Sequence, residues 1–100
     1  MTSMLWENSV DNTSTSTSFT LKNVFFTINV FLVTSDDTVN NYKAGFWYGV
    51  ANYFNVTKTT PPCIGMAQAK LRILKMLSDV EGVTPPIGDF NNDFNEDFMI

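Results

Sequence analysis

The chain has 100 residues, six basic and ten acidic, and its formal net charge at pH 7 is −4. A chain of this length forms one small domain at most. It contains no histidine, which removes the side chain most used as a general base and as a metal ligand. The single cysteine, Cys63, cannot form an internal disulfide bond and has no histidine to activate it. We therefore expect no catalytic residue, metal site or cofactor, and a protein that is not an enzyme.

Charge and composition divide the chain into three parts. All six basic residues lie between Lys22 and Lys75, where Asp36 and Asp37 are the only acids, so that this span carries +4. The last twelve residues contain four acids and no base. We predict a polar arm at 1–18, a body at 19–82 and an acidic tail at 83–100. A 64-residue body buries only about 60% of its unfolded surface, so we expect partner chains.

The predicted arm contains nine Ser or Thr residues among its eighteen. Such polar sequence cannot bury enough apolar surface to offset the entropy of ordering it. We interpret it as a disordered arm. The alternative is that Leu5 and Trp6 dock on a neighbouring subunit.

Residues 19–33 are the most apolar stretch, and their pattern alternates. One side is wholly apolar and consists of Val24, Phe26, Ile28, Val30 and Leu32. The other side is mixed and consists of Phe25, Thr27, Asn29, Phe31 and Val33. This period of two predicts one central strand, buried fully on the first face and partly on the second.

Residues 34–41 have the Ser, Asp and Asn content of a turn, and we interpret Asp36 and Asp37 as solvated turn residues. Residues 42–57 follow, with six aromatic residues between Tyr42 and Phe54. Two glycines and several β-preferring residues favour a strand here, although a helix also fits part of the spacing. We predict that this strand and the central strand form an antiparallel hairpin.

The clearest helix signal follows Pro61 and Pro62. Apolar residues recur at spacings of three and four, at Met66, Ala69, Ile73, Met76, Leu77 and Val80. Gly82 is a typical residue for the end of a helix. The predicted fold class is therefore α+β: a small antiparallel β-hairpin or sheet packed on one amphipathic helix, with a polar N-terminal arm and an acidic, aromatic C-terminal tail.

The tail repeats an Asp-Phe pair with period four. If it is helical, Phe90, Phe94 and Phe98 form one stripe, with Asp93 and Asp97 beside it. Such a stripe fits an apolar groove with a basic rim on a partner. The alternative is that the three rings pack on the body of the same chain.

The function that we expect is protein binding without catalysis, as an interaction module or an assembly subunit that forms oligomers. Six aromatics in thirteen residues exceed what two strands and a helix can bury. The predicted contact residues are Trp47, Tyr48 and Tyr53 in the body, with Phe90, Phe94, Phe98, Asp93 and Asp97 in the tail. One variant of this hypothesis is a virus-encoded accessory or inhibitor protein, since small, acidic, cysteine-poor chains without catalytic residues are common among such inhibitors.

The second hypothesis is binding of single-stranded nucleic acid. Bases would stack on Trp47, Tyr48 or Tyr53, with Lys43 and Lys58 at the phosphates. The acidic, Phe-bearing residues 89–100 resemble the tails of single-stranded DNA-binding proteins, which recruit replication partners and compete with DNA. Here, however, Met99 and Ile100 follow the last Phe, whereas the bacterial tails end in Ile-Pro-Phe. Six basic residues are few, so this hypothesis ranks second.

The longest nearly apolar run, residues 24–33, is half of the roughly 20 residues that a membrane-spanning helix needs. No basic and then apolar leader opens the sequence. We therefore expect a soluble protein without membrane contact, located in the cytoplasm or associated with a virion.

Overall fold

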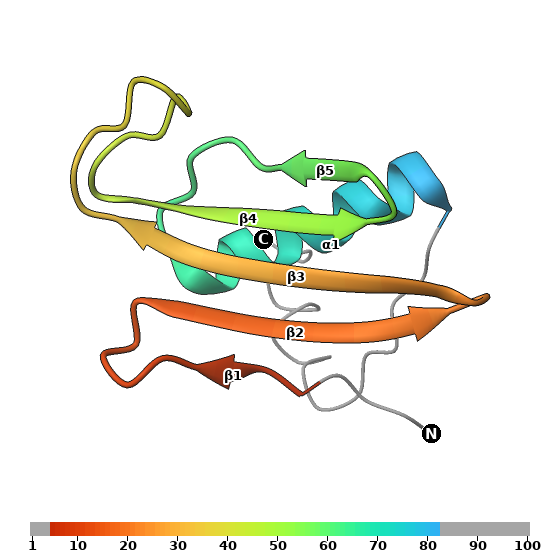
Figure 1. The fold of residues 1–100 in the computed structure, drawn as a ribbon. Helices are drawn as coiled ribbons and strands as arrows, with labels where there is room; N and C mark the ends of the chain where they lie inside the picture. The colour runs from red at the N-terminus through yellow and green to blue at the C-terminus, as the bar shows by residue number, and fades with distance from the viewer. Residues whose placement is uncertain (1–4, 83–100) are drawn as a thin grey trace.

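A computed structural model of the chain describes residues 5–82 (Figure 1). Five antiparallel strands form one sheet in chain order, and one helix follows them. The elements are β1 (Glu7–Asn8), β2 (Ser14–Leu21), β3 (Val24–Val33), β4 (Phe46–Tyr53), β5 (Val56–Thr59) and α1 (Met66–Glu81). The α+β class, with an antiparallel sheet packed on one helix, is confirmed.

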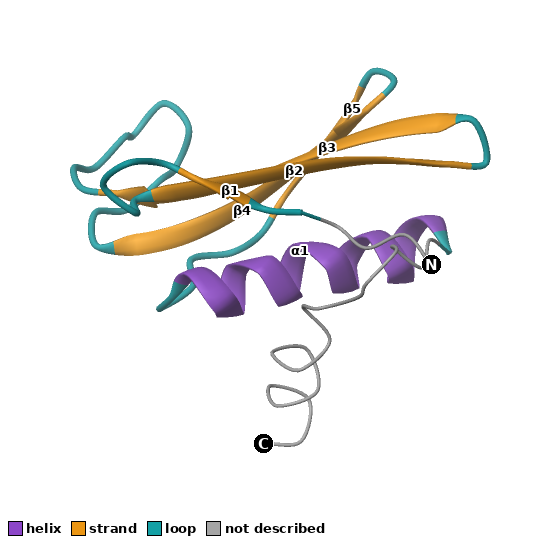
Figure 2. Ribbon diagram, turned by 90° about the horizontal axis from the view of Figure 1, so that it is seen from below, coloured by secondary structure: helices purple, strands orange, loops and turns teal. Residues whose placement is uncertain are grey.

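The molecule has two layers, because α1 lies across one face of the sheet (Figure 2). The core between the layers takes Ile28 from β3, Ala51 from β4, and Ile73 and Leu77 from α1, all fully buried. No described element covers the opposite face, which we call the open face.

The alternation predicted for residues 24–33 is confirmed. Phe26, Ile28 and Val30 of β3 are buried in the core, whereas Thr27 is half-buried and Asn29 is exposed on the open face. The pairing of the strands extends this alternation across the sheet. The open-face positions are Glu7, Ser14, Ser16, Ser18, Thr20, Phe25, Thr27, Asn29, Phe31, Val33, Phe46, Tyr48, Val50, Asn52, Thr57 and Thr59.

The prediction of one central strand over residues 19–33 is wrong. Two strands, β2 and β3, meet at a two-residue turn closed by the pair Leu21 and Val24. Both turn residues have positive φ, 51° at Lys22 and 67° at Asn23, which matches the twist of a hairpin. The apolar pattern continues on both sides of this turn, and the pair Lys-Asn lacks the glycine that usually marks it.

The prediction of a polar arm is wrong for residues 5–18. Residues 14–18 belong to β2, and β1 pairs with β2 through Glu7 and Asn8. Thr15 and Thr17 occupy core-facing positions, where their β-branched side chains suit a strand. Residues 1–4 lie outside the described part of the chain.

The hairpin and the helix are confirmed, but the single strand predicted for residues 42–57 is wrong at both ends. Residues 46–53 form β4, which pairs with β3 across the loop at 34–45, and after a turn at residues 54–55 the chain continues in a separate strand, β5. The helix ends at Gly82, whose φ is 65° and whose N–H donates to Ser78 O at 3.0 Å. It starts at Met66, because the backbone of Cys63 pairs with Trp47 and holds the proline segment along β4. Val80, predicted to lie in the apolar stripe, is 54% exposed.

Candidate binding surface

Two of the three predicted contact residues of the body lie inside the protein. Tyr53 is 5% exposed, and its ring centroid is 5.0 Å from that of Phe26. Tyr48 is 2% exposed, packs against Tyr42 at 4.6 Å, and accepts a hydrogen bond from Lys43 N at 2.8 Å. Trp47 is half-buried and packs against the core. Our assignment of Tyr48 and Tyr53 to partner contacts is therefore wrong.

The rings that cover these two residues come from β3 and from the loop at 34–45. Tyr42 in the loop and Phe31 in β3 pack against Tyr48, and Phe26 in β3 packs against Tyr53. The excess of aromatic residues in this run therefore does not by itself require a partner.

The residues predicted for nucleic-acid binding are not brought together on the open face. Lys58 pairs with Ala51, so it lies on the helix side of the sheet, and Lys43 lies in the loop at 34–45. The strand positions of the open face contain no lysine or arginine.

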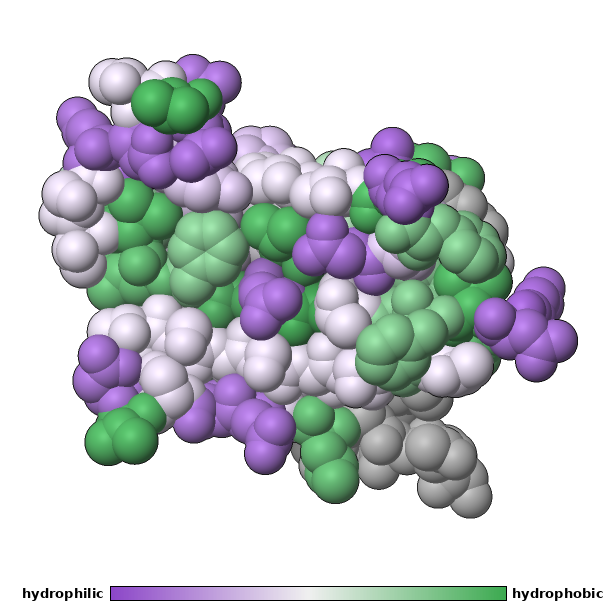
Figure 3. Space-filling model, viewed as in Figure 1, coloured by the Kyte–Doolittle hydropathy of each residue, from purple (hydrophilic) through white to green (hydrophobic). Residues whose placement is uncertain are grey.

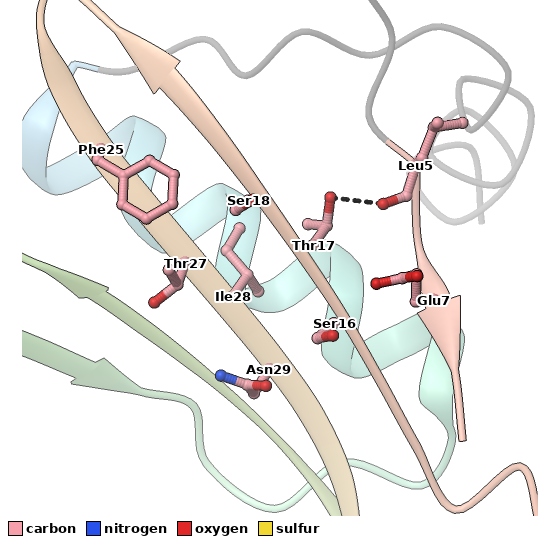
Figure 4. A pocket seen from close by; sticks show the side chains of 9 residues that line it. All are labelled: Leu5, Glu7, Ser16, Thr17, Ser18, Phe25, Thr27, Ile28 and Asn29. Carbon is pink, nitrogen blue, oxygen red and sulfur yellow. Dashed lines mark hydrogen bonds between the residues drawn. The ribbon is translucent and has the colours of Figure 1, made fainter. Parts of the chain in front are cut away.

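The open face is hollowed along β2. The open-face residues of β2 are Ser and Thr, which are smaller than their neighbours on β1 and β3, so the surface dips between them. The hollow has a volume of about 670 Å³ (Figure 4). We call it the β2 trough; its lining residues are Leu5, Glu7, Ser16, Thr17, Ser18, Phe25, Thr27, Ile28 and Asn29.

Two exposed phenylalanines lie at one end of this face. Phe25 is 58% exposed and Phe54 is 80% exposed. Phe25 lies in β3 close to the β2–β3 turn, and Phe54 lies in the turn between β4 and β5, beyond the last β3–β4 pair, Thr27 and Asn52. Figure 3 shows hydrophobic side chains toward both ends of the open face and hydrophilic ones between them. We call Phe25 and Phe54 the aromatic pair.

Phe54 has an unfavourable backbone conformation. Its φ is 50°, in the left-handed region, at the turn between β4 and β5. A bulky residue there is a genuine outlier, and such strain concentrates at functional positions. The sequence signal was available, since an aromatic residue precedes Asn55 where a turn would favour glycine or asparagine.

The open face is almost uncharged. Glu7 is the only charged residue at its strand positions, and no described residue forms an ion pair with it. Residues 5–82 contain six bases and six acids, so their formal net charge is zero. Contacts on this face therefore depend mainly on apolar area and hydrogen bonding.

Within residues 5–82, no group of three or more potential ligands could hold a metal ion. The same part of the chain contains no helix that is both long and apolar enough to span a membrane. The predicted tail contacts Phe90, Phe94, Phe98, Asp93 and Asp97 lie outside the described residues. Comparisons with protein-family models, curated proteins and solved structures found no match.

Proposed function

We propose that the protein is a non-catalytic protein-binding module, or a subunit of an assembly, that contacts its partner through the open face. The observation that carries this proposal is Phe54, an exposed aromatic side chain on a strained backbone, at the same end of the sheet as a second exposed ring, Phe25 (Figure 1). The ring gains little burial within the described chain to offset that strain.

Burial of the Phe54 ring against a partner would offset the free-energy cost of its strained backbone. Full burial of a phenylalanine side chain contributes roughly 1.5–3 kcal/mol, and a few such residues dominate the energy of most protein interfaces. The two exposed rings at one end of the sheet, with Ser, Thr and Asn at neighbouring strand positions, offer the apolar surface and polar rim that a protein interface needs.

Protein fits this surface better than single-stranded nucleic acid does. Phosphate binding depends on lysine and arginine, and the strand positions of the open face offer a carboxylate, Glu7, instead. The aromatic pair could stack on bases, but a groove without positive charge would not hold the backbone.

Affinity capture from the source cells tests the proposal. The baits are the full-length chain, its Phe25→Ser/Phe54→Asn variant, and an Ile64→Ser variant, which removes an equally exposed apolar residue outside the trough. We expect at least one protein to be recovered about tenfold less with the aromatic-pair variant and equally with the Ile64→Ser control. Equal recovery on all three baits would contradict the proposal.

A second measurement addresses the nucleic-acid alternative. Fluorescence anisotropy of labelled oligo-dT with the full-length chain, at low salt, should show no binding at micromolar protein. Binding that weakens steeply with salt and is lost in Phe25→Ser/Phe54→Asn would reverse the order of the two hypotheses.

A further inference from the structure

We propose that the β2 trough receives an extended segment of the protein partner, with a basic residue at one end and an aromatic or large aliphatic residue four positions away. This inference rests on the proposed function. It adds the backbone conformation of the segment and the chemistry of the residues that face the trough.

The width of the trough selects an extended segment. One side is formed by β3, and the other is formed by Glu7 of β1, which spans only Glu7–Asn8, and by Leu5 before it. With strands about 4.8 Å apart, β1 and β3 are separated by roughly 9.6 Å, before the volume of their side chains is subtracted. A helix with side chains is about 10–12 Å wide, so it would not enter. One extended chain fits.

The register of the sheet gives the spacing along the trough. Ser16 pairs with Glu7 on one side and with Asn29 on the other. Four residues further along β2, Thr20 pairs with Phe25. Strand residues rise about 3.4 Å each, so along β2 roughly 13–14 Å separate Ser16, beside Glu7, from Thr20, beside Phe25. Residues i and i+4 of an extended partner segment have the same separation.

The chemistry differs along this length. At one end Glu7 is exposed, and its side chain lies beside the trough, where a lysine or arginine can meet the carboxylate (Figure 4). At the other end the aromatic pair offers apolar surface. In the middle, Ser18 pairs with Thr27, which leaves room for a small residue at i+2.

Side chains supply the hydrogen bonds to the backbone of the segment. The backbone groups between β2 and β3 are used in the sheet, but the hydroxyls of Ser16, Ser18 and Thr27 and the amide of Asn29 point to the open face. Each can donate and accept, as the N–H and C=O groups of a peptide require.

Pentapeptides test this directly. The full-length, ¹⁵N-labelled chain is titrated with Lys-Thr-Ala-Thr-Phe and with the reverse sequence, because either chain direction fits the spacing. We expect one of them to shift the amide signals of β2 and β3 at millimolar peptide while those of α1 stay unchanged. Matched controls are Glu-Thr-Ala-Thr-Phe and Lys-Thr-Ala-Thr-Ser, each with its reverse.

Substitutions in the protein test which residue of the peptide lies at each end of the trough. Glu7→Lys should weaken binding of the lysine peptide about threefold and strengthen binding of the glutamate peptide by a similar factor, as expected for an exposed ion pair. Phe25→Ser should weaken both phenylalanine peptides about tenfold, and Ile64→Ser should change neither.

The outcomes separate this inference from the proposed function. The inference would be overturned if no peptide shifted the signals. It would also be overturned if the peptides bound but Glu7→Lys did not reverse the preference between the lysine and glutamate peptides. Affinity capture that depends on the aromatic pair could still hold, and the partner would then bind by another shape. Shifts of the same trough residues by maltotriose or cellotriose, with none by the peptides, would assign the trough to a neutral glycan instead.

Discussion

Phe54 has its ring on a backbone conformation that asparagine and glycine adopt at less cost. With 80% of the residue exposed, replacement loses little packing. We predict that Phe54→Asn raises the free energy of unfolding by about 0.5–1 kcal/mol while it weakens partner binding. Urea denaturation of the full-length chain measures the first effect.

A decrease in the free energy of unfolding of Phe54→Asn would contradict this prediction. A loss of more than about 1 kcal/mol in Phe54→Asn would mean that the ring packs on the body, as a core phenylalanine does. In that case the ring would be structural, and the strain at this residue would have an explanation within the chain.

Thr15 and Thr17 form a matched pair on the core-facing side of β2. Thr15 Oγ1 is buried without a hydrogen-bond partner among the described residues, whereas Thr17 Oγ1 donates to Leu5 O at 2.8 Å. Valine has nearly the same shape and no hydroxyl. We predict that Thr15→Val raises the free energy of unfolding by about 1 kcal/mol and that Thr17→Val lowers it by a similar amount. Effects of equal sign in urea denaturation would contradict this assignment.

The stability of the loop at 34–45 should depend on pH through the carboxyl group of Asp37. Hydrogen bonds from the Asn40 side chain and from the N–H groups of Asn40 and Val39 lower the pKa of its carboxyl. A carboxylate pKa below the unfolded value of about 3.9 stabilises the fold above that pH, and the effect is lost as pH falls through the folded pKa. We therefore expect the ¹³C signal of this carboxyl to titrate below about 3.9. A midpoint at or above that value would show that these hydrogen bonds do not persist in solution.

Between the two layers, β4 and α1 lie in close contact at Gly49. A Cβ at Gly49 would lie 2.9 Å from the backbone oxygen of Ala69 and 2.9 Å from Ile73 Cβ, so the helix would have to move. We predict that Gly49→Ala lowers the free energy of unfolding by about 1–3 kcal/mol and that Gly49→Ser lowers it further. Denaturant midpoints test this order. An unchanged midpoint in Gly49→Ala would mean that the two layers have room to separate.

The elements also differ in how well the sequence predicts them. β3 and α1 were found because their apolar residues repeat with periods of two and near 3.6. β2 was missed because Thr15 and Thr17 occupy its core face, and a run of Ser and Thr has no contrast in hydropathy. The turn at Lys22 and Asn23 was missed because apolar residues continue across it without glycine or proline.

The candidate surface was less predictable than the fold. The sequence shows which residues are aromatic, but their burial depends on tertiary contacts: Tyr42 in the loop packs against Tyr48, and Phe26 in β3 packs against Tyr53. Glu7 was not singled out, because its role depends on β1 pairing beside Ser16. The trough exists only once β1, β2 and β3 are adjacent, so no local pattern could indicate it.

In the whole molecule the two faces of the sheet have separate tasks. The helix face holds most of the buried residues, and the open face carries the trough, the exposed Phe25 and Phe54, and the buried Tyr48 beside the loop at 34–45. Because the backbone ladder of the sheet lies between them, a side chain on one face does not touch a side chain on the other. Stability and binding should therefore respond to different substitutions.

Leu77 and Phe25 test this separation. Leu77 is fully buried under the sheet, so Leu77→Ala should lower the free energy of unfolding by about 2–5 kcal/mol, whereas Val80→Ala, on the exposed side of α1, should change it by less than about 0.5 kcal/mol. Well below its unfolding temperature, Leu77→Ala should still capture the partner. Phe25→Ser should keep most of its stability and lose capture. Thermal melts and the affinity capture, run on the same preparations, measure both. Parallel losses in the two variants would mean that binding and folding depend on one shared set of contacts.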